Sequence, residues 1–203
     1  MTRVIYAHLQ LWDPMGQMKL DEGLRYGGET MLFVLAAEDL ASGLLKLLDS
    51  VAARRLGLIR LNYAGYAEDF AEDHFPFEVD MAAMVEDARE TGRICAMGPY
   101  TFEPTAALKP EEVMLACVDL AQGAGGELRL AARRGSVAEG LRDLVEAAKT
   151  EARAIVALED VKDASEHSEV FDFEDSVEDM VKRARASSGV VFSDAIGYER
   201  PLH

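Results

Sequence analysis

Residues 75–89 read FPFEVDMAAMVEDAR, and residues 171–185 read FDFEDSVEDMVKRAR. The segments lie 96 positions apart and share seven identical residues, which in the first are Phe75, Phe77, Glu78, Met84, Val85, Ala88 and Arg89. In the first segment Met81, Met84, Val85 and Ala88 recur at helical spacing, which predicts a helix with one apolar face. Self-similarity of this kind is the signature of an internal repeat.

The similarity extends outward from this pair of segments. At an offset of 97, residues 58–61 (LIRL) overlay 155–158 (IVAL), and the apolar positions of 40–51 fall on those of 137–148. Nearer the front of each half, residues 4–11 resemble 113–120, and Gly27-Gly28-Glu29 resembles Gly125-Gly126-Glu127. We therefore predict a tandem duplication. The first copy spans 1–105 and carries a hairpin insertion at about 12–26, and the second copy spans 106–203.

The same order of elements is predicted in both copies. Residues 4–11 alternate as a half-buried strand does, and 31–37 form a continuous apolar run typical of a central strand. The turn-like sequence 121–126 predicts an antiparallel hairpin. A helix follows over 40–51, and in the second copy Ser136 and Glu139 have the spacing of a capping box.

A third strand is predicted at 56–61 and 152–158. A second helix then ends at Gly92 or Gly189, as glycine C-caps do, before a last strand at 93–97 or 189–193. The ββαβαβ order resembles ferredoxin-like folds. This resemblance implies an α+β two-layer unit with two helices packed on one side of a four-stranded sheet in each copy. Strand order, and whether the two sheets join, stay open.

Composition limits the classes of function. The 203 residues are 49% hydrophobic and 29% charged, with no apolar run near the ~20 residues that cross a bilayer and no signal-peptide pattern. A soluble, cytoplasmic protein is expected, with Cys95 and Cys117 as buried apolar residues. The net charge of −16, from 37 acids and 21 bases, argues against nucleic acid and anionic membrane as partners.

Motifs that carry catalysis were not found in the sequence. There is no P-loop, dinucleotide fingerprint, calcium loop or Gly-x-Ser-x-Gly elbow; Gly123–Gly126 is interpreted as a turn, and the four histidines lack ligand spacing. We predict a protein that is not an enzyme, with no catalytic residues, cofactor or metal. A hydrolase with its site between the repeats is the third hypothesis, and it requires convergent polar groups with perturbed carboxylates.

Acids collect in the connection before the second helix of each copy. Residues 64–88 hold eight acids and no Lys or Arg, and residues 159–179 hold ten acids against Lys162. Tyr63, Tyr66 and Phe residues are interleaved among them, and acids beside aromatics suit Lys and Arg of a partner. The predicted partner-binding residues are Glu68, Asp69, Glu72, Asp73, Asp163, Glu166, Glu169 and Asp172. The alternative interpretation is a solvated loop that its Phe residues anchor to the core.

The leading hypothesis is therefore a non-catalytic acidic protein, monomer or homodimer, that binds a basic protein. An immunity protein or inhibitor that masks a basic surface of a toxin or enzyme is one concrete form. Each first helix also opens near Gly43-Leu44 or Gly140-Leu141, which resembles ACT-type regulatory domains. That resemblance implies a small effector such as an amino acid, and an ACT-like small-molecule sensor is the second hypothesis.

Overall fold

The computed structural model describes residues 2–13, 28–70, 78–102, 113–122, 125–166 and 173–199, and the side chains of 99–102 and 199 lie outside this description. The first half contains β1 (Arg3–Trp12), β2 (Gly28–Ala37), α1 (Leu40–Ala53), β3 (Gly57–Tyr66), the short 3₁₀ helix η1 (Ala67–Asp69), α2 (Met81–Thr91) and β4 (Cys95–Phe102). The second half contains β5 (Val113–Gln122), β6 (Gly125–Arg134), α3 (Val137–Thr150), β7 (Ile155–Asp163), η3 (Ala164–Glu166), α4 (Val177–Ala186), β8 (Val191–Phe192) and β9 (Ile196–Glu199). The chain is an α+β protein.

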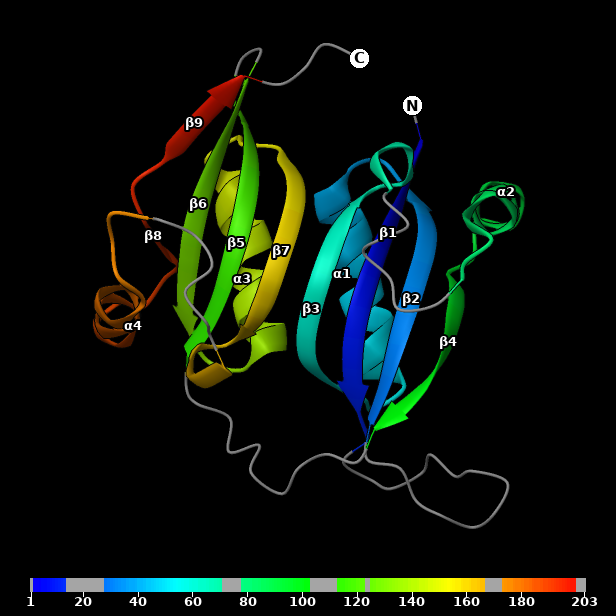
Figure 1. Ribbon diagram of the computed structural model, residues 1–203, viewed down its shortest axis with the longest axis horizontal. Helices are drawn as coiled ribbons and strands as arrows, with labels where there is room; N and C mark the ends of the chain where they lie inside the picture. Colours follow the sequence, from blue (N-terminus) through cyan, green and yellow to red (C-terminus); the bar gives the residue numbers. More distant parts are fainter. Residues whose placement is uncertain are drawn as a thin grey trace.

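The described strands form one antiparallel sheet, in the order β4-β2-β1-β3-β7-β5-β6-β8, with β9 also paired to β6 (Figure 1). The sheets of the two halves therefore join, through β3 and β7 at the centre. The Cα partners there are Leu61 with Val161, Tyr63 with Glu159, and Ala64 with Leu158. Exchanging each residue of β3 with its counterpart 97 positions later in β7 leaves the pairing unchanged: the pair Leu61–Val161, for example, becomes Leu158–Ala64. A local twofold axis between the two strands has this effect.

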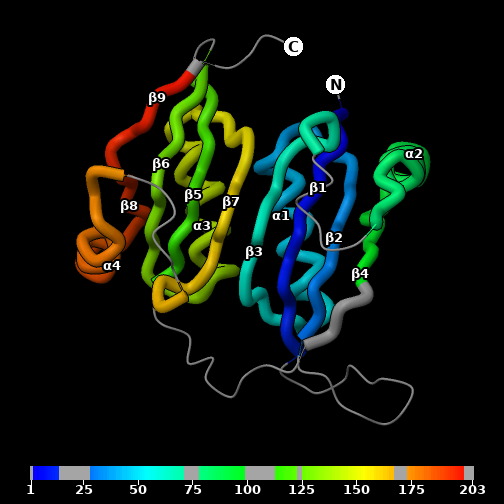
Figure 2. Tube along the Cα trace, viewed as in Figure 1, coloured from blue at the N-terminus to red at the C-terminus, as the bar shows by residue number. Residues whose placement is uncertain are grey.

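The helices cover both faces of the sheet. On one face α1 and α3 contact each other and bury Ile5, Ala7, Leu9 and Leu11 of β1 together with Met114, Ala116, Val118 and Leu120 of β5 (Figures 1 and 2). On the opposite face α2 covers Val4, Tyr6, Leu32 and Val34, and α4 covers Val113, Leu115, Leu130 and Ala132. The expectation that both helices of a copy lie on one side of its sheet is wrong, because β1, β2, β5 and β6 bury apolar residues on both faces.

Capping explains where most of the helices begin and end. Asp39 and Ser136 form capping boxes at α1 and α3, which confirms the box predicted at Ser136. Gly92 caps α2 with φ of 64°, as predicted. The cap predicted at Gly189 is wrong, because α4 ends three residues earlier and Ser187 caps it with φ of −99°. With this negative φ, the backbone at position 187 does not adopt the left-handed conformation that favours glycine. The helix can therefore end at a serine.

The glycines near the start of each first helix have a packing role. A Cβ on Gly140 would lie 2.7 Å from Cβ of Met114, and a Cβ on Gly43 would collide with the side chain of Ile5. Real Cβ atoms do not approach other atoms so closely, so these glycines let α1 and α3 lie directly on β1 and β5. The predicted hairpin insertion at about 12–26 falls almost wholly outside the described residues.

Neither cysteine is in a disulfide: Cys117 is buried, as predicted, and Cys95 is half-buried. None of the helices in the described part of the chain is long and apolar enough to cross a membrane.

Candidate functional site

The predicted acidic residues do not form one surface. Glu68 and Asp69 lie in η1 directly after β3, whereas Asp163 ends β7 and Glu166 lies in η3. Because β3 and β7 are antiparallel neighbours, these two groups lie at opposite ends of the central strand pair (Figure 1). The remaining predicted residues, Glu72, Asp73, Glu169 and Asp172, lie outside the described residues.

A pocket lies at each end of the short pairing between β3 and β7. The larger one, which we call the junction pocket, has a volume of about 470 Å³. Its polar lining is Arg3, Tyr63, Tyr66, Asp69, Asp119 and Tyr198, and its other lining residues are Ala121, Ala154, Val156 and Ala157. It therefore draws on β1, β3, η1, β5, β7 and β9, from both halves of the chain.

The smaller pocket has a volume of about 230 Å³ and a mostly apolar lining that includes Trp12, Leu58, Ile59, Asp163 and Glu166. The sequence alignment matches these positions to the junction pocket: Trp12 corresponds to Ala121, Ile59 to Val156, and Glu166 to Asp69. The Trp12 indole lies against Gly57, where any Cβ would collide with its ring. A large side chain therefore narrows the pocket at one end of the strand pair, while alanine leaves a wider pocket at the other end.

Tyr198 reaches the junction pocket because β6 carries glycine beneath it. Gly126 pairs with Tyr198 across the β6–β9 ladder, and a Cβ on Gly126 would lie 2.6 Å from the Tyr198 hydroxyl. Without that Cβ the ring can lie across the sheet, where its hydroxyl donates a hydrogen bond to Asp119 on β5. The interpretation of Gly125 and Gly126 as turn residues is wrong, because they begin β6 and pair with both β5 and β9, and Gly126 makes room for a side chain of the pocket.

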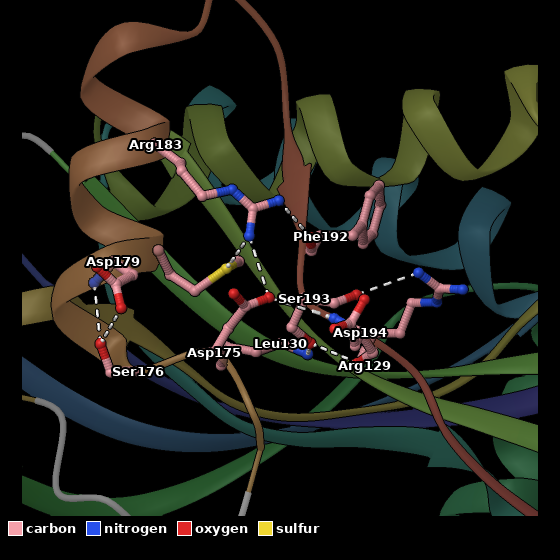
Figure 3. A network of polar contacts seen from close by, with 10 residues as sticks. Arg129, Leu130, Asp175, Ser176, Asp179, Arg183, Phe192, Ser193 and Asp194 are labelled. Atoms are coloured by element: carbon pink, nitrogen blue, oxygen red, sulfur yellow. Dashed lines mark hydrogen bonds and ion pairs between the residues drawn. The ribbon is translucent and has the colours of Figure 1, made fainter.

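A polar network between α4 and the sheet fixes the chain that leads into β9 (Figure 3). Ser193 donates its backbone N–H to Leu130 and accepts the Leu130 N–H on its hydroxyl at 2.9 Å. Arg183 of α4 bonds Asp175 at 3.0 Å and donates to the Phe192 carbonyl at 2.8 Å. These contacts fix the position of the chain at the end of β8. They therefore define where the following strand, β9, begins to pair with β6.

Charges in the junction pocket are negative in sum. Arg3 is paired with Glu68, and its guanidinium lies 3.2 Å from the centroid of the Tyr66 ring. The charged residues that line the pocket are two carboxylates, Asp69 and Asp119, and one cation, Arg3. Burial raises the pKa of Tyr63, and the nearby carboxylates of Glu159, Asp69 and Asp119 raise it further. The phenol of Tyr63 therefore lies in a field of negative charge.

A second polar group lies in the middle of the sheet, beside the β3–β7 pairing. Asp160 binds both Arg60 and Lys162, with Lys162 Nζ 2.6 Å from its Oδ2 and the Lys162 side chain only 2% exposed. His8 is buried next to Asn62, and burial together with the Arg60 charge lowers the pKa of His8 to about 4. Asp160 and Lys162 both lie on β7, whereas Arg60 lies on β3, so the Arg60–Asp160 ion pair connects the two central strands. Both cations lower the pKa of Asp160, against the effect of its burial.

Sequence reasoning found only part of the pocket. Asp69 belongs to the predicted acidic connection, and Tyr63 and Tyr66 are among the aromatics noted beside it. Arg3, Asp119 and Tyr198 were missed because each lies in a different element, far away in sequence. Within the described ranges no group of three His, Cys, Asp or Glu residues is placed to hold a metal ion.

Comparison of the chain with protein-family models, with curated proteins and with solved structures finds no match.

Proposed function

We propose that this protein is a non-catalytic, cytoplasmic acidic protein that binds a basic surface of another protein. An immunity protein or inhibitor that masks a toxin or an enzyme is the concrete form. The observation that carries the proposal is the junction pocket, where Asp69 and Asp119 come together among three tyrosines. Carboxylates beside aromatic rings complement Lys and Arg side chains.

The charge of the whole chain supports this proposal. The net charge is −16, and residues 1–105 and 106–203 each contribute −8. A strongly negative protein attracts basic partners over distances of about a Debye length, ~8 Å at physiological salt, and this raises the rate of association. Electrostatic steering of this kind does not require a catalytic group.

The test is a salt titration of a purified complex. Proteins captured from a native extract are identified, and one that is basic is purified and its affinity measured between 50 and 300 mM salt. We expect the affinity to fall steeply as salt rises, because exposed charges are screened. Capture of acidic or neutral partners only, or an affinity independent of salt, would contradict the proposal.

The position of the junction pocket favours a second candidate function, that of an ACT-like small-molecule regulator. The junction pocket lies between the halves of the chain, where such a protein would hold its effector, and its volume is within the ~300–1,000 Å³ of small-molecule sites. A thermal-shift screen of amino acids and nucleotides tests this candidate. A ligand that binds only the folded state raises the unfolding midpoint in a concentration-dependent way.

Tandem duplication remains part of the proposal. The supporting observations are the matching element order of the halves, their mirrored strand order about β3 and β7, and the symmetric register of that pair. Each copy would then be a ββαβαβ unit that shares its element order with ferredoxin-like folds, with its two helices on opposite faces of the sheet.

A further inference from the structure

We propose that the junction pocket binds a guanidinium group, supplied by an arginine side chain of the basic partner. This inference rests on the proposed function and names the chemical group that the site recognises. A pocket of about 470 Å³ is large enough for the end of one long side chain, and it is open to solvent beside exposed Tyr198 and Asp69.

The aromatic lining favours a flat cation. Three tyrosines from two strands line the pocket: Tyr63 and Tyr66 on β3, and Tyr198 on β9. Guanidinium groups stack on aromatic faces and are more weakly hydrated than ammonium groups, so a tyrosine-lined pocket selects Arg over Lys. The chain already contains one such contact, because the Arg3 guanidinium lies over Tyr66 and is paired with Glu68.

Two carboxylates supply the acceptors. Asp69 follows β3 and Asp119 lies on β5, so they reach the pocket from separate elements. A guanidinium presents five N–H donors in a plane and can bond a carboxylate while its face stacks on a ring. The raised pKa of Tyr63, caused first by burial and then by Glu159, Asp69 and Asp119, agrees with a negative potential that attracts a cation.

The test is an NMR titration of the full chain with three blocked amino acids: Nα-acetyl-arginine methylamide, the lysine analogue and the citrulline analogue. Citrulline has nearly the shape of arginine but no charge, so it separates cation binding from packing. We expect blocked arginine to shift the amide signals of Ala121 and Ala157 with a millimolar dissociation constant. We expect blocked citrulline to bind at least tenfold more weakly, and blocked lysine to fall between them. Equal binding of arginine and citrulline, or no shift with either, would overturn the inference.

Variants connect the binding to the pocket. Asp119→Asn and Asp69→Asn should each weaken the binding of blocked arginine about tenfold, which corresponds to a loss of ~1.4 kcal/mol in binding free energy. Asp49→Asn is the matched control, since Asp49 is an exposed aspartate on α1 that pairs with Arg142 away from the pocket. It should leave the binding unchanged. Asp69 is itself exposed, so its substitution tests the pocket even if Asp119→Asn impairs folding. Equal effects of all three variants would mean that only overall charge matters, and would refute a specific site.

Free arginine distinguishes the source of the guanidinium. If the ligand is a partner side chain, free arginine should bind no more tightly than blocked arginine. Free arginine that binds more than tenfold tighter would overturn the partner assignment and favour the small-molecule regulator.

Failure of this inference differs from failure of the proposed function. If the affinity of the captured complex depends on salt but blocked arginine does not bind, the guanidinium inference is overturned while the proposed binding of a basic protein is retained.

Discussion

Asp160 shares its carboxylate between Arg60 and buried Lys162. Its φ of 52° is left-handed, a conformation that Asp and Asn tolerate better than most residues. Asp160→Asn therefore preserves the backbone but leaves Lys162 without its anion. We expect this variant to lose about 3–5 kcal/mol in the free energy of unfolding, measured with urea, because an unpaired buried charge is costly.

The matching control removes the cation as well. In the double variant Asp160→Asn/Lys162→Met a flexible apolar side chain replaces the buried ammonium, and we expect most of the lost stability to return. A single variant that costs less than about 1 kcal/mol would show that water reaches Lys162, in disagreement with its 2% exposure.

His8 should make stability depend on pH. Burial and the charge of Arg60 lower its pKa in the folded protein to about 4, from 6.5. As pH falls below 6.5 the unfolded chain binds a proton that the folded protein does not bind, so stability falls until about pH 4. Between pH 7 and 5.5 we expect a loss of roughly 1 kcal/mol, measured by urea unfolding. His8→Gln should remove this loss. If the unfolding free energy of the variant depended on pH as steeply as before, the loss would come from other titrating groups.

At the scale of elements, close packing of α3 on β5 depends on Gly140. Alanine there gains helix propensity worth ~1 kcal/mol but collides with Met114. Overpacking in a well-packed core costs ~1–3 kcal/mol, so we expect Gly140→Ala to destabilise the protein overall, as measured by thermal unfolding. Gly197→Ala is the control, because no atom lies within 4 Å of the added Cβ, and it should change stability much less.

Most elements could be predicted from the sequence, because apolar residues repeat at the period of a strand or a helix. The face that each second helix covers was predicted wrongly, although the chain held a signal. The run 31–37 is apolar without alternation, as in a strand buried on both faces, and Val4 and Tyr6 are as buried as Ile5. Strand β9 was missed because its four residues, Ile196–Glu199, carry too short a pattern.

The pocket was the least predictable feature. Asp69, Tyr63 and Tyr66 lie close together in sequence and could be grouped by composition. Asp119 and Tyr198 come together only through the β5–β6–β9 pairing, which depends on strand order. Strand order is a property of tertiary structure and leaves no local pattern in the sequence.

At the scale of the whole molecule, the core under α1 and α3 is continuous across the halves. Leu158, which is fully buried, pairs with Ala64 and belongs to a cluster drawn from both halves. We expect Leu158→Ala to lose about 2–5 kcal/mol and to lower amide-exchange protection equally in β1 and β5. Ile196→Ala, at a side chain 41% exposed, should change little.

Unfolding followed by circular dichroism should accordingly show one transition, because two halves that share a core unfold together. Two separate transitions, or loss of protection in the second half alone, would mean that the halves unfold independently.

The unequal ends of the β3–β7 pair have a practical consequence. The chain contains a single tryptophan, Trp12, and it lies at the end with the smaller pocket, whereas Tyr63, Tyr66 and Tyr198 line the junction pocket at the other end. Tryptophan emission therefore reports on one end, and tyrosine absorption, to which the remaining tyrosines also contribute, is sensitive to the other. A ligand in the junction pocket should perturb the tyrosine spectrum while the tryptophan emission stays constant, so each binding experiment carries its own optical reference.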